Sequence, residues 1–176
     1  MAPDHRTRTA LLGDRPSILT LVQLAFATGG RDGGEEVDIV KTTWALGAAA
    51  EGLELVAVVH GVVVGHVLGA RGDLAGRDVV GVAPLAVSSA HQRAGVGSAL
   101  MRELISRAEA SGWPLLVLLG SPAYYSRFGF EPSWPLDISY GPVGPNDPHF
   151  QVRRLSAYAP TIRGQFTYCW ERSNTE

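Results

Sequence analysis

Halfway along the chain, the sequence reads His91-Gln92-Arg93-Ala94-Gly95-Val96-Gly97-Ser98. The glycines at 95 and 97 lack the Cβ atoms that would keep a bulky anion away from the backbone. The stretch also opens a helix, whose first N–H groups have no partner within the helix and whose N-terminus carries about half a positive charge. These features together predict a turn that binds a phosphate group without a large basic cluster.

The elements on either side of this turn follow from the spacing of apolar residues. After Gly95, apolar residues recur every four positions up to Ala108, which predicts a long amphipathic helix that ends at Gly112. Residues 79–87 are rich in valine and predict a strand, and residues 115–119 form the apolar run typical of a buried strand. A strand, a helix and a second strand in this order predict a right-handed crossover.

Farther from the turn, the same reasoning predicts the remaining elements. Two β-branched runs flank His60-Gly61, which indicates a hairpin. Residues 134–148 are rich in proline and glycine and are expected to form an irregular connection. The other expected elements are helices over residues 17–27, 35–50 and 124–128, and strands over residues 55–59, 62–68, 150–155 and 164–170.

Length and composition indicate an ordinary globular protein. The chain has 176 residues, 45% hydrophobic and 18% charged, with a net charge of −2, so we expect a single domain over residues 1–176 and no nucleic-acid partner. A lone cysteine, Cys169, excludes an internal disulfide framework and a multi-cysteine metal site. The histidines show no metal-ligand spacing, so no metal is expected.

Targeting signals are also not expected. The segment from Met1 to Arg15 lacks the apolar core of a secretory signal, which argues against export. The apolar residues 53–70 include charged and glycine residues and are better explained by two strands than by a membrane span. With one cysteine, these features favour a cytoplasmic protein that does not bind a membrane.

Two familiar phosphate-binding turns fit the sequence poorly. A P-loop requires Gly-Lys-Ser/Thr, but the only lysine is Lys41, far from the turn, so this class is excluded. A dinucleotide fingerprint requires a third glycine where Leu100 stands, and an acidic residue after the next strand, which is followed instead by Gly120-Ser121. A domain that binds NAD or ATP is therefore disfavoured, although it stays an alternative.

A third class resembles the sequence over nearly its whole length. The resemblance rests on Leu85-Ala86-Val87, on Gln92-x-x-Gly95-x-Gly97, and on Tyr125-Ser126-Arg127-Phe128-Gly129-Phe130, with a helix and a buried strand between them. Together these segments resemble the GNAT superfamily of acetyl-CoA-dependent N-acetyltransferases, in the branch with a Tyr-Tyr pair in its second motif. The resemblance implies an α/β (α+β) fold with a mixed, mostly antiparallel central sheet flanked by helices. It also implies that the sheet is splayed between its fourth and fifth strands, residues 79–87 and 115–119.

The resemblance implies a role for each motif. The backbone around Leu85, Ala86 and Val87 would bind the pantetheine arm of acetyl-CoA and polarise the thioester carbonyl. Tyr125 would act as the general acid that protonates the leaving thiolate, while a small-molecule or peptide amine attacks directly. The expected pyrophosphate-binding residues are Gln92, Arg93, Ala94, Gly95, Val96, Gly97 and Ser98.

Several residues keep two interpretations. Gln92 either follows the motif or caps the turn, Arg93 either reaches a phosphate or lies on the surface, and Tyr124 is favoured as a packing residue. No general base stands out, so a water chain or an acceptor that is already neutral would also serve. The candidates for the base are Asp78, Glu35, Glu36 and His66, of which His66 is more often structural on an apolar strand.

The acceptor is not identified by the sequence. The acids Asp32, Glu35, Glu36 and Asp38 would favour a cationic amine, but acids near a helix start also pair with the helix dipole. Trp134, Tyr140 and Phe150 are candidates to line a pocket for a bulky acceptor. The length of the acyl group and a homodimer are left open. A CoA-binding module without turnover is the main alternative to an enzyme.

Overall fold

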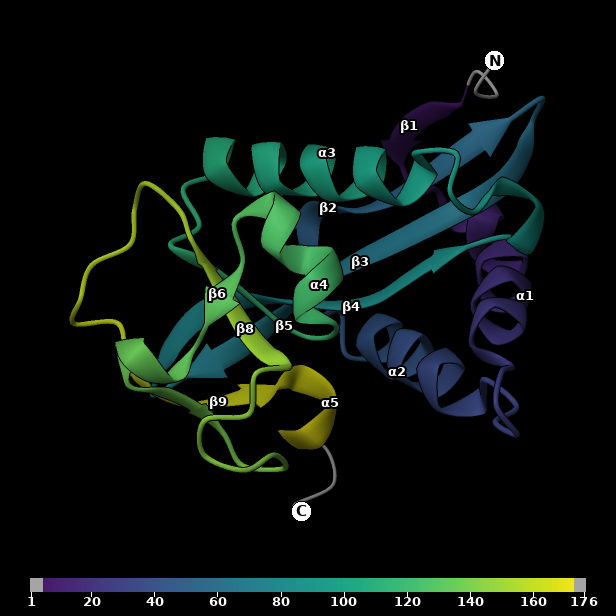
Figure 1. Cartoon of the computed structure of the whole chain (residues 1–176). Coiled ribbons are helices and arrows are strands. Elements are labelled where there is room, and N and C mark those ends of the chain that lie inside the picture. The colour runs from purple at the N-terminus through teal and green to yellow at the C-terminus, as the bar shows by residue number, and fades with distance from the viewer. Residues whose placement is uncertain (1–4, 173–176) are drawn as a thin grey trace.

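The computed structural model describes residues 5–172, and its centre is a large open sheet (Figure 1). Along the sheet the strands follow the order β1-β2-β3-β4-β5-β8-β6, while β9 pairs with β3 and with β7. Neighbouring strands are antiparallel except for β4 with β5 and β7 with β9. The strands are β1 (Arg6–Thr9), β2 (Ala49–Val59), β3 (Val62–Leu74), β4 (Arg77–Val87), β5 (Leu115–Leu119), β6 (Glu131–Pro132), β7 (Ile138–Tyr140), β8 (Phe150–Arg154) and β9 (Gly164–Tyr168). The expected mixed, mostly antiparallel sheet is confirmed.

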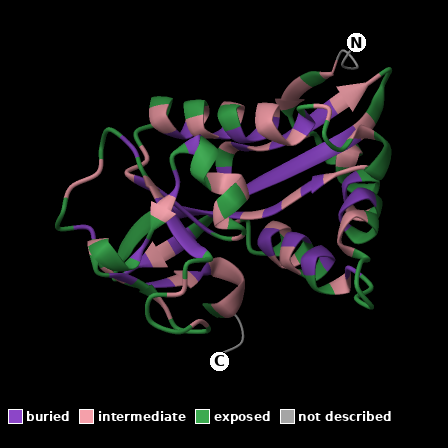
Figure 2. Ribbon diagram, viewed as in Figure 1, coloured by how far each residue is buried: buried purple, intermediate pink, exposed green. Residues whose placement is uncertain are grey.

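Helices cover both faces of this sheet (Figures 1 and 2). The long helix α3 (Val96–Ala110) buries its apolar stripe against one face, and α1 (Arg15–Phe26) and α2 (Gly34–Ala45) cover the other. Short helices complete the fold: α4 (Pro122–Tyr125), α5 (Cys169–Arg172) and the 3-10 turns η1 (Leu12–Asp14), η2 (Ser89–His91), η3 (Ser126–Phe128) and η4 (Trp134–Leu136). A third apolar cluster lies where β5, β7, β8 and β9 meet.

Three local expectations were wrong. The second helix ends at Ala45 rather than residue 50, because the chain turns at Gly47 (φ 59°) and Ala49 already begins β2. Residues 138–140, expected to be irregular, form β7 through pairing with β9. The last expected strand stops at Tyr168, where the backbone N–H donates to Glu171 Oε2 at 2.8 Å and α5 begins.

The parallel pair β4–β5 is short, and the two strands part beyond it. The paired positions are Val80 with Leu116 and Gly81 with Val117. β4 then continues to Val87 and β5 to Leu119 without further pairing between them. We call the space between residues 82–87 and residues 118–119 the wedge; it lies at the position where the sequence predicted the sheet to splay.

A β-bulge in β4 lies at the inner end of the wedge. Opposite β3, Val67 pairs with Leu85 and Gly69 with Val82, so β4 carries one more residue than β3 over this interval. The extra residue lies around Ala83 and Pro84, and Pro84 has no N–H to donate to the ladder. The bulge therefore releases backbone groups of β4 just before the predicted pantetheine-binding residues 85–87.

No helix in residues 5–172 is long and apolar enough to cross a membrane. No export signal was predicted over the segment from Met1 to Arg15, and the first four residues of this segment lie outside the described part of the chain.

The close approach of α3 to β3 depends on Gly65. A Cβ at this position would lie 2.8 Å from Val96 Cγ1 and 2.9 Å from Leu100 Cδ1. We expect Gly65→Ala to displace the first turn of α3 and to lower the free energy of unfolding by about 1–3 kcal/mol in urea titrations. Gly13→Ala is the control, because nothing lies within 4 Å of the added methyl group. Equal stability of the two variants would contradict this packing.

Candidate functional site

The N-terminus of α3 forms the expected turn. Gly95 precedes the helix in the left-handed conformation (φ 85°), and Arg93 also has a positive φ of 59°. The first helical hydrogen bond runs from Ala99 N–H to Gly95 O at 2.9 Å. The N–H groups of residues 96–98 precede it and belong to the end that a helix leaves unpaired. The structure therefore brings the predicted anion-binding amides together at one end of α3.

Gly97 allows three elements to meet at this turn. A Cβ on Gly97 would lie 2.8 Å from the hydroxyl oxygen of Tyr124 on α4 and 3.6 Å from Val87 Cγ2 on β4. Gln92 Nε2 donates a hydrogen bond to Val87 O at 3.2 Å, so its side chain ties the turn to the end of β4. Arg93 is exposed. Tyr124, for which packing was favoured, thus also presents its hydroxyl to the start of α3.

The predicted pantetheine-binding residues lie along one side of the wedge. Leu85 and Val87 are half-buried and pack against the core below α3, whereas Ala86 is buried on the opposite face with α1 and α2. Their backbone follows the bulge directly, so it borders the gap between β4 and β5.

Tyr125 lies on the α3 side of the same region. Its ring packs over Gly120 just after β5, where an added Cβ would lie 2.5 Å from Tyr125 Cε2. The ring also contacts Phe130 and Tyr124 edge-on, with centroid distances of 5.9 Å and 4.9 Å. Burial, and to a lesser extent Tyr124, raises the pKa of Tyr125 to about 12. The phenol therefore keeps its proton at neutral pH.

The turn that carries Tyr125 is held from β8. Arg153 Nη1 donates to Phe128 O at 2.6 Å, next to Gly129, which has a φ of 80°. A Cβ on Gly129 would meet Arg153 Nη1 and displace the guanidinium. The glycine in the Tyr-Ser-Arg-Phe-Gly-Phe segment is thus favoured chiefly by its left-handed conformation.

A second phenol, which the sequence did not predict, lies beside the wedge: that of Tyr168 at the end of β9. It is 4% exposed, and its ring lies against Gly81 of β4, where an added Cβ would be 2.6 Å from Cε1. Its hydroxyl interacts electrostatically with the backbone N–H of Leu119 and with Tyr125. Burial, the largest cause, raises the pKa of Tyr168. The available signal was a glycine within a valine-rich strand, which often marks a close approach.

The four candidates for the general base lie in different places. Asp78 is exposed near the start of β4, at the opposite end from the bulge. Glu36 is buried and paired with Arg31, while Glu35 is exposed on α2 and lies 3.3 Å from the same guanidinium. His66 is fully buried on β3, and its Nε2 lies 3.0 Å from Glu54 Oε1, which suits the structural interpretation.

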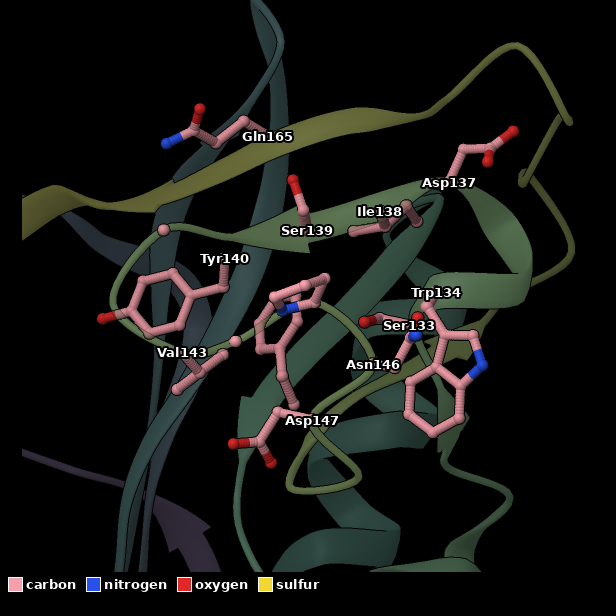
Figure 3. A pocket seen from close by; sticks show the side chains of 14 residues that line it. Ser133, Trp134, Asp137, Ile138, Ser139, Tyr140, Val143, Asn146, Asp147 and Gln165 are labelled. Carbon is pink, nitrogen blue, oxygen red and sulfur yellow. The ribbon is translucent and has the colours of Figure 1, made fainter.

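Two hollows lie near the elements expected to bind the acceptor. One, of about 400 Å³, contains Trp134, Tyr140 and Phe150 in its wall, so the structure brings these three predicted residues together (Figure 3). Trp134 and Tyr140 lie on opposite sides of it in this view. The other, of about 550 Å³, lies between α2 and α5 and is lined by residues that include Asp32, Glu35, Asp38 and Trp170.

Comparison with known proteins identifies the fold. The crystal structure of a GNAT family N-acetyltransferase, YhbS from Escherichia coli, in complex with CoA aligns with a TM-score of 0.86 at 29% identity, covering 100% of this chain and 96% of that one. A GNAT family acetyltransferase from Brucella melitensis in complex with acetyl-CoA aligns with a TM-score of 0.77 at 26% identity, covering 94% of this chain and 96% of that one.

Sequence relatives agree with the structural ones. The uncharacterized N-acetyltransferase YhbS of Escherichia coli (strain K12) is 38% identical over 99 residues, which are 55% of this chain and 59% of that protein. The uncharacterized N-acetyltransferase YjhQ of the same strain is 35% identical over 102 residues, 56% of each protein. The matched segments thus span less than two thirds of these relatives.

The family assignment comes from a longer match. A model of the acetyltransferase (GNAT) family matches residues 19–130, which extend from α1 through the turn at Gly95 and Gly97 to Phe130. Because this match covers well over half of the chain, the protein belongs to the GNAT family of acetyltransferases.

Proposed function

We propose that this protein, as one GNAT domain over residues 1–176, transfers an acetyl group from acetyl-CoA to an amine by direct attack. The observation that carries the proposal is the wedge: a bulged β4 and a parted β5, with the unpaired N-terminus of α3 at its outer end and the half-buried phenol of Tyr125 beside it. Structural relatives bound to CoA and acetyl-CoA support it.

The turn at the start of α3 fits a pyrophosphate. A Cβ added at Gly95 would have nothing within 4 Å, whereas a Cβ added at Gly97 would lie 2.8 Å from the hydroxyl oxygen of Tyr124. The amides of residues 93–98 would hold the phosphates, assisted by the partial positive charge of the helix end. Arg93 is exposed at this turn and would add one positive charge.

Acetyl-CoA supplies an acetyl group activated as a thioester. The backbone around Leu85, Ala86 and Val87 would bind the pantetheine arm and donate a hydrogen bond to the thioester carbonyl oxygen. A donor of this kind typically stabilises a transition state by about 3 kcal/mol. Residues 85–87 stay paired with β3, but β5 has parted from them on their other side, so no β4–β5 pairing has to break before the thioester binds.

Tyr125 would protonate the thiolate that leaves. A thiol has a pKa of roughly 8.5, whereas that of Tyr125 is raised to about 12, so the proton transfer is uphill and requires the two atoms to be held close together. The raised pKa of Tyr125 ensures that the proton is present over the whole neutral range. Its rigid packing against Gly120 and Phe130 supplies the positioning.

The acceptor would enter from the face that bears α1 and α2. The hollow between α2 and α5 carries three carboxylates beside an indole, a combination that attracts a cationic amine. The amine must lose a proton before it attacks. Asp78 is exposed at the end of β4 away from the bulge, and Glu36 is paired with Arg31. A water chain, or the binding of an amine that is already neutral, would therefore serve instead.

Calorimetric titration tests the proposal and its glycine turn together. The wild-type protein should bind acetyl-CoA but neither NAD nor ATP. Gly97→Val should abolish this binding, because the added methyl groups would fill the space beside Tyr124. Gly144→Val, at an open loop position, should bind normally. Binding of NAD instead, or full affinity in the folded Gly97→Val protein, would contradict the assignment of the turn.

Tyr125→Phe tests the acid. We expect turnover with an amine found by screening to fall by about 100-fold, while the affinity for acetyl-CoA stays near normal, because the variant loses only the hydroxyl. Release of the CoA thiol measures turnover and calorimetry measures affinity. Unchanged turnover would remove Tyr125 from the mechanism. Acetyl-CoA binding with no acetylation of any amine, even by the wild type, would favour a CoA-binding module without turnover.

The same variant should change the pH dependence of stability. A phenol whose folded-state pKa is about 12, against about 10 when unfolded, stabilises the fold fully below pH ~10, and this stabilisation is lost as the pH rises towards 12. Tyr125→Phe should therefore make the free energy of unfolding fall less steeply above pH ~10. Urea unfolding at several alkaline pH values, with circular dichroism confirming a folded baseline, measures the two slopes. Equal slopes would contradict the burial of this hydroxyl.

A further inference from the structure

Tyr168 reaches across two neighbouring strands to the wedge. On β9 it is paired with Gly72 of β3, and its ring extends over Gly81 of β4, which leaves the space that the ring fills. Its hydroxyl also interacts electrostatically with the backbone N–H of Leu119 on β5. The ring therefore lies across β4 at the last β4–β5 pair, where the two strands part.

The backbone N–H of Leu119 lies on the wedge side of β5. The next amide, Gly120 N–H, donates to His149 O at 2.8 Å on the β8 side. Successive N–H groups of a strand point to opposite edges, so Leu119 N–H points towards β4. The last β4–β5 pair is Gly81 with Val117, so this amide lies beyond the parallel ladder, and the Tyr168 hydroxyl interacts with it electrostatically.

The ring of Tyr168 is held on several sides. Trp170 stacks on it with a centroid distance of 4.2 Å, and Phe166 meets it edge-on at 4.6 Å. Its backbone N–H donates a hydrogen bond to Glu171 Oε2, and Glu171 Oε1 accepts a hydrogen bond from the Tyr140 hydroxyl. A fully packed aromatic ring of this kind does not move aside without the loss of many contacts.

The proposed position of acetyl-CoA directs the acyl end towards this ring. With the pyrophosphate at residues 93–98 and the pantetheine arm along residues 85–87, the thioester would lie beside Leu85, next to the bulge at Ala83 and Pro84. The next residues inward are Val82 and Gly81, and Gly81 is the residue on which Tyr168 lies. Each methylene added to the acyl group would therefore extend towards the closed inner end of the wedge.

We propose that Tyr168 restricts the acyl donor to acetyl-CoA, because its ring closes the inner end of the wedge. The inference rests on the proposed function, since it requires the acyl-CoA to lie in the wedge. It assigns to a residue of the C-terminal strand the choice among acyl donors, a property that the motifs around Gly95 and Tyr125 do not determine.

Calorimetric titration with CoA, acetyl-CoA, propionyl-CoA and butyryl-CoA tests this proposal without knowledge of the acceptor. For the wild type we expect similar affinity for CoA and acetyl-CoA, and affinity for butyryl-CoA lower by about 10-fold or more, because extra methylenes do not fit a packed site. Tyr168→Ala should bring butyryl-CoA to within about 3-fold of acetyl-CoA.

Three further variants separate the ring from other effects. Tyr168→Phe keeps the ring and should keep the wild-type order of affinities. Tyr168→Leu keeps apolar bulk against Gly81 but ends short of Leu119, and replaces the alanine variant if that protein does not fold. Tyr158→Ala removes a half-buried ring that follows the C-terminal end of β8. This variant should change stability but not the order of affinities.

The outcomes distinguish this inference from the proposed function. If the wild type binds neither CoA nor acetyl-CoA, the proposed function itself fails. If the wild type binds acetyl-CoA and binds butyryl-CoA equally well, Tyr168 does not limit the acyl group. The proposal is also overturned if a folded Tyr168→Ala or Tyr168→Leu protein binds acetyl-CoA and still discriminates against butyryl-CoA as strongly as the wild type.

Discussion

Two parallel strands that part in the middle of a sheet leave backbone groups that must find other partners. An unpaired N–H or C=O away from water costs about 1–3 kcal/mol, so the gap between β4 and β5 is stable only if nearby groups satisfy it. On the β5 side, Gln151 Nε2 donates to Gly120 O at 2.9 Å, and the Tyr168 hydroxyl interacts electrostatically with Leu119 N–H. On the β4 side, Gln92 donates to Val87 O. The wedge is therefore built by the segments around it as much as by its own strands.

Glycines decide where the tyrosines around the wedge can lie. Each of three phenols occupies space that a side chain would otherwise fill: Tyr124 beside Gly97, Tyr125 over Gly120, and Tyr168 over Gly81. The added Cβ distances of 2.5–2.8 Å are too short for a real Cβ, so a larger residue at any of these glycines would move a ring. The same contacts position the phenols without a dense network of side-chain hydrogen bonds.

The part of the fold that the sequence predicted well is the part governed by local patterns. Residues 115–119 form the expected strand, and α3 follows from a four-residue repeat that its packing on β3 requires. The end of α2 was misplaced because small apolar residues continue beyond Gly47, and a local pattern does not distinguish a helix from the start of a buried strand there. β7 and the place of Tyr168 depend on β9 pairing with β3, a contact between residues distant in sequence. Gly72 and Gly81 indicate that another side chain lies against each of these strands, but they do not indicate which ring fills the space beside each glycine.

The charges around the wedge differ between its two faces, and this difference suits a reaction between an anionic donor and a cationic acceptor. The α3 face offers the positive end of a helix and exposed Arg93, whereas the α2 face offers Asp32, Glu35 and Asp38. Fields of opposite sign on opposite faces raise the local concentration of each substrate where it is needed and disfavour it on the other side. Because the net charge is only −2, this separation arises from where the charges lie and not from their total. Both proposed approaches therefore lead to the same gap, beside which Tyr125 packs in the apolar cluster under α3 and Tyr168 packs in the cluster of β5, β7, β8 and β9.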